Sequence, residues 1–242
     1  MRALLIALFC FFGVMQSRAI YADDLNGEAI LQASIKRHDP DGRWQSAILK
    51  FHAEEPRLGN PRRYSRIMLD NNTGAFTLER NRDQHISIHT ISDDGAYRTT
   101  LDGKIMTDPD LIKKYRLAPA RNIGYRKFSH DLYGLPMSLS GDAVAEYGET
   151  TETTYNGDKS YRLSLTLKDG FFSNYWAVYI AVEDERLLGV EMIFPDDPLK
   201  GERLYFDKEI EIAGMYLPRI RHWHELSDDS YSGSDIIVKS ID

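Results

Sequence analysis

Two alternating stretches decide the fold of this chain: residues 160–168, SYRLSLTLK, and residues 174–182, NYWAVYIAV. In the first stretch, tyrosine or leucine occupies every second position and polar side chains stand between. Side chains along a β-strand point alternately to the two faces of a sheet, so this period indicates strands with one buried face. The same pattern continues through residues 186–195, 202–212 and 215–225. Together these segments predict an antiparallel meander.

The rest of the chain extends this sheet. Residues 24–38 carry apolar side chains at helical spacing and predict one N-terminal helix. From Trp44 onward, further alternating segments are separated by turn signals, and residues 234–240 supply a last strand. About eleven strands are expected in all. We therefore predict a mainly β fold of the α+β class, built as one curved antiparallel sheet or half-open β-barrel.

The regular spacing of strands is interrupted once, between residues 107 and 139. Asp108 followed by Pro109 is a typical helix start, with a capping side chain and then proline at the first helical position. A second helical stretch begins at Pro119 and ends near Gly134. We predict that these helices, within residues 108–133, lie as a lid across the concave face of the sheet.

Residues 1–19 have the features of an export signal. Arg2 precedes an apolar run, and small residues lead up to an expected cleavage after Ala19. This run is shorter than the about 20 residues that span a bilayer. The single cysteine, Cys10, lies within the signal and lacks the surroundings of a lipoprotein-processing site. We expect a periplasmic or secreted protein of the Gram-negative envelope, with one domain, residues 20–242, and no disulfide.

Charge excludes one class of partner. The full chain has a formal net charge of −7, and removal of Arg2 and Arg18 with the signal lowers it to −9. An acidic protein repels phosphate backbones, so no nucleic-acid partner is expected.

Residues 111–130 reverse this balance, because they contain six basic residues and no Asp or Glu. Such a segment suits a membrane surface or an acidic partner protein, and a solvated helix face is the alternative. The six residues are Lys113, Lys114, Arg116, Arg121, Arg126 and Lys127.

A second basic cluster lies in a predicted hairpin connection. It comprises Arg57, Arg62, Arg63 and Arg66. We interpret this cluster as a solvated turn whose strand-edge charges discourage aggregation.

Aromatic residues are plentiful and mostly occupy alternating positions of predicted strands. The plain interpretation is that they fill the core between sheet and helices. The sharper hypothesis is that a curved sheet under a lid leaves a pocket for an apolar or acylated ligand. We expect a monomeric carrier or chaperone without a cofactor. Its predicted ligand-binding residues are Trp44, Phe51, Tyr133, Met137, Trp176 and Trp223.

Histidines provide the case for an enzyme. His222 and His224 would project from the same face of one strand, a spacing that metal sites can use. A catalytic zinc site needs three protein ligands, and the sequence identifies no third one, so we predict no metal site. A metal-dependent enzyme and a scaffold without a pocket are nevertheless the two alternative functions. No nucleophile elbow, phosphate-binding glycine loop or dinucleotide fingerprint is present.

Three motifs together resemble a known family. They are residues 38–44, HDPDGRW; residues 132–137, LYGLPM; and residues 233–236, GSDI, which follow Trp223. As a set they resemble an uncharacterised family of bacterial cell-envelope proteins that is frequent in Bacteroidetes. This resemblance implies an envelope location and no particular activity.

The predicted order of elements also resembles the LolA/LolB lipoprotein carriers. That resemblance implies an N-terminal helix, a half-closed antiparallel barrel and a helical lid over a cavity that accepts acyl chains. It concerns architecture, and architecture alone does not determine function.

Overall fold

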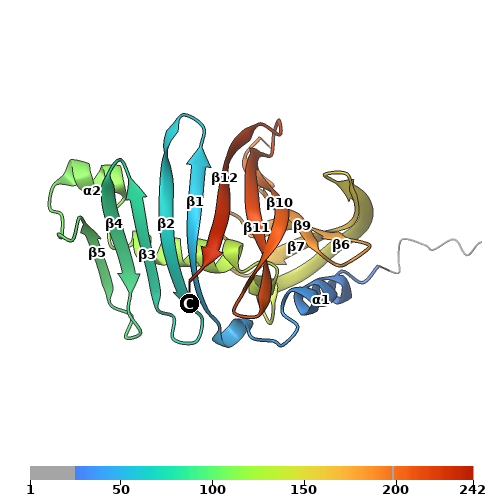
Figure 1. Ribbon diagram of the computed structural model, residues 1–242. Coiled ribbons are helices and arrows are strands. Elements are labelled where there is room, and N and C mark those ends of the chain that lie inside the picture. The colour runs from blue at the N-terminus through green and yellow to red at the C-terminus, as the bar shows by residue number, and fades with distance from the viewer. Residues whose placement is uncertain (1–24, 198, 242) are drawn as a thin grey trace, which may run out of the picture.

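The computed structural model describes residues 25–197 and 199–241, so the predicted export signal lies outside the described residues. The described strands form one twelve-stranded antiparallel sheet in the order β5-β4-β3-β2-β1-β12-β11-β10-β9-β8-β7-β6 (Figure 1). β5 and β6 stand at its two ends, so the sheet is open and curved, as predicted. The strands are β1 (Ile48–Arg57), β2 (Asn60–Asp70), β3 (Phe76–Arg82), β4 (His85–Ile91), β5 (Tyr97–Leu101), β6 (Val144–Tyr155), β7 (Asp158–Leu167), β8 (Tyr175–Ala181), β9 (Leu187–Ile193), β10 (Gly201–Ile212), β11 (Met215–Glu225) and β12 (Tyr231–Ser240).

The strands predicted from alternation are confirmed. In β7 and β8, Leu163 pairs with Val178 and Leu165 pairs with Trp176, and all four side chains are buried. They belong to a core that lies on one face of the sheet and also includes Leu31 of helix α1. We call this helix-covered side of the sheet the inner face.

Helix α1 (Gly27–His38) begins where the Asn26 side chain accepts a hydrogen bond from the backbone N–H of Ala29, at 3.1 Å. A short 3₁₀ turn, η2 (Trp44–Ser46), follows α1 in place of the strand start predicted at Trp44. The Asp39 carboxylate explains the difference. It accepts the backbone N–H groups of Arg43 and Trp44, at 2.8 and 2.9 Å, and thereby holds this segment in a turn.

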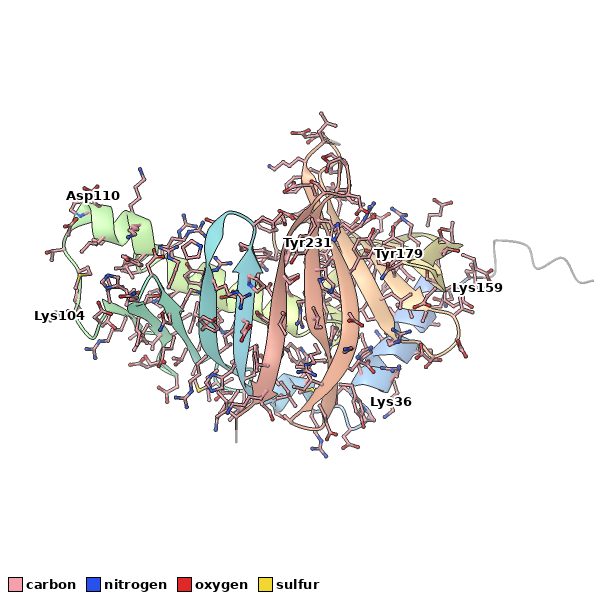
Figure 2. The ribbon with its side chains drawn as sticks, turned by 45° about the horizontal axis from the view of Figure 1, so that its top comes forward. Lys36, Lys104, Asp110, Lys159, Tyr179 and Tyr231 are labelled. Atoms are coloured by element: carbon pink, nitrogen blue, oxygen red, sulfur yellow. The ribbon has the colours of Figure 1, made fainter. Side chains whose placement is uncertain are left out.

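The interrupting segment contains the predicted helices, α2 (Pro109–Tyr115) and α3 (Arg121–Phe128), followed by a π-helical turn, η3 (Ser129–Tyr133), and a 3₁₀ turn, η4 (Met137–Leu139). Figure 1 shows the yellow-green helical segment after α2 crossing behind the central strands. Asp110 of α2 lies at the opposite end of the molecule from Lys159 of β7 (Figure 2). The lid across the inner face is therefore α3 with η3, whereas α2 lies near the β4–β5 edge. Within the described ranges, no helix combines the length and apolar character needed to cross a membrane.

Candidate ligand-binding site

Charged side chains occupy inward positions on five neighbouring strands, β3, β2, β1, β12 and β11. On β1, for example, Glu55 follows the buried Phe51 and Ala53 at alternate positions, so it shares their face. Burying charge is costly unless it is paired, which makes these positions unusual for a strand interior. We call the set the inner charged row, and it comprises Arg80, Arg63, Glu55, Arg57, Asp235 and Arg221.

Glu55 is the centre of one half of this row. Its carboxylate accepts two hydrogen bonds from Arg80, at 2.7 and 3.1 Å, and one from the Ser65 hydroxyl, at 2.7 Å. Burial by itself would raise the pKa of Glu55, but the positive charges of Arg80 and Arg63 outweigh it and lower that pKa. Glu55 is therefore a buried carboxylate that stays ionised at neutral pH.

Asp235 is the centre of the other half and has no measurable exposure. It accepts hydrogen bonds from Arg57 Nη2, at 2.6 Å, and from the indole N–H of Trp223, at 2.8 Å. Burial raises the pKa of Asp235, although the charge of Arg57 acts in the opposite direction. The hydrogen bond to Asp235 fixes the orientation of the Trp223 ring.

Arg221 joins the row to the lid. Its fully buried guanidinium donates to the backbone carbonyls of Leu132 and Tyr133, at 3.1 and 3.3 Å, and lies 4.4 Å from the centre of the Tyr133 ring. Burial lowers the pKa of Arg221 to about 10, so it is still protonated at neutral pH. Arg221 thus fixes the end of η3 against the sheet.

A pocket of about 340 Å³ lies between the inner charged row and α3, and we call it the arginine pocket. Five aromatic side chains line it, from α3, from the β7–β8 turn and from β11: Tyr125, Phe128, Phe171, Phe172 and Trp223. Five arginines and only two carboxylates also line it: Arg57, Arg63, Arg80, Arg116, Arg121, Glu55 and Glu202. The pocket therefore combines an aromatic wall with an excess of positive charge.

Two buried polar atoms in this lining lack hydrogen-bond partners among the described residues: Nε of Arg63 and Oε2 of Glu202. Burial, together with the nearby negative charge of Glu225, raises the pKa of Glu202 to about 7. Near neutral pH, Glu202 is consequently only partly ionised, so it does not fully offset one positive charge. The polar part of the pocket is not saturated by the protein itself.

A second pocket, of about 510 Å³, lies on the other side of α3. Ile123, Arg126 and Lys127 of α3 line it, and Trp176 of β8 lines it from the sheet. Helix α3 therefore separates two pockets on the inner face, and its alternate sides contribute to each.

The six predicted ligand-binding residues are all buried, but they do not come together at one pocket. Trp223 lines the arginine pocket and Trp176 lines the second pocket. Trp44, Phe51, Tyr133 and Met137 pack together in the core where the lid meets the sheet. The phase of the strands predicted burial, but it did not distinguish a packed interior from a pocket wall.

The predicted basic surface of residues 111–130 is divided into three parts. Lys113 and Lys114 are exposed on α2. Arg116 and Arg121 line the arginine pocket. Arg126 and Lys127 line the second pocket, where the Arg126 side chain also donates to the Gly74 carbonyl at 2.8 Å.

The interpretation of the second basic cluster as a solvated turn is wrong for two of its members. Arg57 and Arg63 point inward to the arginine pocket, whereas Arg62 and Arg66 are exposed. The alternation of the strand could have predicted this orientation, because Arg63 lies two positions before the inward-facing Ser65 and therefore shares its face.

The strand histidines are separate from both pockets. His222 contacts the Ser234 hydroxyl at 2.9 Å, and His224 contacts the Asp229 carbonyl at 2.7 Å. They flank the inward-facing Trp223 and therefore lie on the outer face. In the part of the chain that the structure describes, no three His, Cys, Asp or Glu side chains are grouped to hold a metal ion.

Two of the sequence motifs make contacts that stabilise the fold: one fixes α1 to the sheet, and the other packs the end of η3 against η2. The buried His38 contacts the Tyr216 carbonyl at 2.5 Å and accepts the Leu187 N–H at 3.1 Å. At the other motif, a Cβ on Gly134 would lie 2.1 Å from the Trp44 ring, so this close approach requires glycine. The motifs are therefore structural in this chain.

Comparison with known proteins gives one family and several distant structures. A search of curated proteins gives no match. Among solved structures, a LolA superfamily protein from Nitrosomonas europaea is 8% identical, with 89% of this chain and 93% of that chain covered and a TM-score of 0.48. A putative outer membrane lipoprotein-sorting protein domain from Vibrio parahaemolyticus is 15% identical, with 89% and 93% covered and a TM-score of 0.47. A DUF1329 family protein from Desulfovibrio piger is 12% identical, with 89% and 94% covered and a TM-score of 0.43. Residues 4–184 match the model of DUF6503, described as a family of unknown function, and the chain therefore belongs to the DUF6503 family.

Proposed function

We propose that this protein is an exported, non-enzymatic carrier or chaperone of the cell envelope. Its ligand is apolar or acylated, a lipid or a lipoprotein, and it binds on the inner face of the sheet beside the lid. The observation that carries the proposal is the aromatic wall of the arginine pocket. Phe128 and Phe171 meet edge to face at 5.3 Å, and Phe128 stacks on Trp223 at 6.1 Å. These rings form a continuous apolar surface next to open space.

The size of the pocket fits this proposal. Small-molecule sites commonly have volumes of about 300–1,000 Å³, and the arginine pocket lies within that range. Each methylene buried there would contribute about 0.8 kcal/mol. Part of an acyl chain would therefore suffice for useful affinity, after the cost of immobilising the ligand.

Gly124 offers a direct test. It lines the pocket from α3, and a Cβ at this position would meet no atom within 4 Å. We expect Gly124→Phe to fill the pocket without disturbing the fold. Ala120→Phe is the matched control, because Ala120 is exposed at the start of the same helix and does not line the pocket.

The assay is titration of the mature protein with pyrene-labelled palmitic acid, followed by fluorescence. We expect binding by the wild type and by Ala120→Phe, and at least tenfold weaker binding by Gly124→Phe. Absence of binding by the wild type would contradict the proposal. Unchanged binding by Gly124→Phe would exclude the arginine pocket as the site.

The exposed lysines of α2 suggest how the protein would deliver its ligand to a membrane. Lys113 and Lys114 stand next to Arg116, which lines the arginine pocket, so a charged surface adjoins that pocket. We propose that this surface contacts anionic membranes during ligand transfer. The variant Lys113→Glu/Lys114→Glu should sediment less with phosphatidylglycerol vesicles, and equal sedimentation would contradict this contact.

A further inference from the structure

We propose that the arginine pocket selects amphiphiles with an anionic headgroup, a carboxylate or a phosphate, whose charge is met by Arg63, Arg116 and Arg121. The inference deepens the proposed function and rests on it. An apolar chain alone would need only the aromatic wall. The arginines opposite that wall have no role in binding a neutral hydrocarbon.

The first argument is that two of the five arginines in the pocket are already paired with carboxylates of the protein. Arg57 and Arg80 are occupied by the buried carboxylates of Asp235 and Glu55, with their closest contacts at 2.6 and 2.7 Å. These two pairs belong to the folded interior. The other three arginines are therefore the ones whose charge remains to be matched.

The second argument is that those three arginines lack close partners of opposite charge among the described residues. Arg63 approaches Glu55 only to 3.9 Å, and its Nε lacks a hydrogen-bond partner among the described residues. Burial lowers the pKa of Arg63, and the opposing charge of Glu55 does not fully offset it, so the charged form of Arg63 is under-compensated. Arg116 and Arg121 form no ion pair with any residue that the structure describes.

The third argument is the chemistry of the guanidinium group. Arginine presents several N–H donors in a planar fork that matches the oxygens of a carboxylate or phosphate. A donor in a pocket with aromatic walls gains more from an anion than it would in water, because the local dielectric constant is low. An anion at this position would also supply the missing partner for Arg63.

The two ends of such a ligand would have different neighbours. The chain would lie along Phe128, Phe171 and Trp223, and the headgroup would face Arg63 and Arg121. A fatty acid and a lysophosphatidic acid share this plan, with a carboxylate as the anion in the first and a glycerol-linked phosphate in the second.

The test compares ligands that carry the same alkyl chain. Palmitic acid, lysophosphatidic acid and the neutral hexadecanol compete with a pyrene-labelled hydrocarbon for the mature protein at neutral pH. We expect one or both anions to bind at least tenfold more tightly than hexadecanol. Preference for palmitic acid would identify a carboxylate, and preference for lysophosphatidic acid would identify a phosphate. Equal binding of all three would overturn this inference while leaving the proposed function intact, and displacement by none would overturn both.

Variants separate headgroup recognition from chain binding. Arg116→Gln/Arg121→Gln changes two exposed side chains, so folding should be preserved. We expect this variant to lose about tenfold in affinity for the anion and nothing for hexadecanol. Arg62→Gln/Arg66→Gln is the matched control, because both arginines are exposed and neither lines the pocket. Equal losses for the anion and for hexadecanol would contradict recognition of the headgroup.

Discussion

Replacement of Arg221 by methionine tests how the lid is attached to the sheet. The change removes two hydrogen bonds to the carbonyls of η3, each worth about 1.5–3 kcal/mol with a charged donor. It also removes the contact with the Tyr133 ring, worth about 2 kcal/mol when desolvated. Against these losses, the variant no longer has to bury a guanidinium group, which offsets several kcal/mol. We expect a net loss of about 3 kcal/mol in the free energy of unfolding.

Two measurements distinguish this account from a general loss of packing. Urea denaturation followed by circular dichroism gives the free energy of unfolding, and hydrogen exchange should show the largest loss of protection in residues 129–135. Arg66→Met is the control, since Arg66 is exposed on β2 and its loss should change stability by about 0.5 kcal/mol or less. A loss below about 1 kcal/mol for Arg221→Met, or exchange unchanged in the lid, would refute the reasoning.

Three further substitutions test other contacts. Gly134→Ala should lower the free energy of unfolding by about 2 kcal/mol or more, measured by urea titration, because the new methyl group collides with Trp44. Asn122→Ala should cost about 2 kcal/mol in the same assay, since it removes the buried partner, at 2.9 Å, of His89. Burial raises the pKa of Glu202 in the folded protein to about 7, so its ionisation destabilises the wild type as pH rises from about 4.5 to about 7. Glu202→Gln should remove a pH-dependent loss on the order of 1 kcal/mol, because the side chain is partly exposed and solvent screens the effect, and a stability profile parallel to that of the wild type would contradict this assignment.

Much of the sheet could be predicted because one face of nearly every strand is buried. Where burial and alternation coincide, as in β7, the period of the sequence reports the face directly. The helical interruption was also predictable, because Asp108 and Pro109 are strong local signals. Trp44 was placed wrongly at a strand start, since strand alternation does not report the local side-chain contact by which the Asp39 carboxylate holds this segment in a turn.

The site was less predictable, because it consists of charged residues at positions where a strand normally carries apolar ones. Arg63 kept the inward phase of its strand, but charge near a predicted turn was taken as a sign of exposure, and the inward-facing Glu55 was not singled out. Arg80 and Arg221 were not singled out at all. The partner of Arg80 is Glu55 on β1, and the partners of Arg221 are backbone carbonyls of η3, so only the folded arrangement reveals how these charges are accommodated.

The central claim is that the arginine pocket binds an acylated ligand, and native mass spectrometry of the protein purified from its native cells tests it most directly. We predict a population whose mass exceeds that of the polypeptide by one lipid molecule and which is lost from Gly124→Phe but retained by Ala120→Phe. Only the bare polypeptide mass in the wild type, unchanged after incubation with palmitic acid or lysophosphatidic acid, would contradict the account.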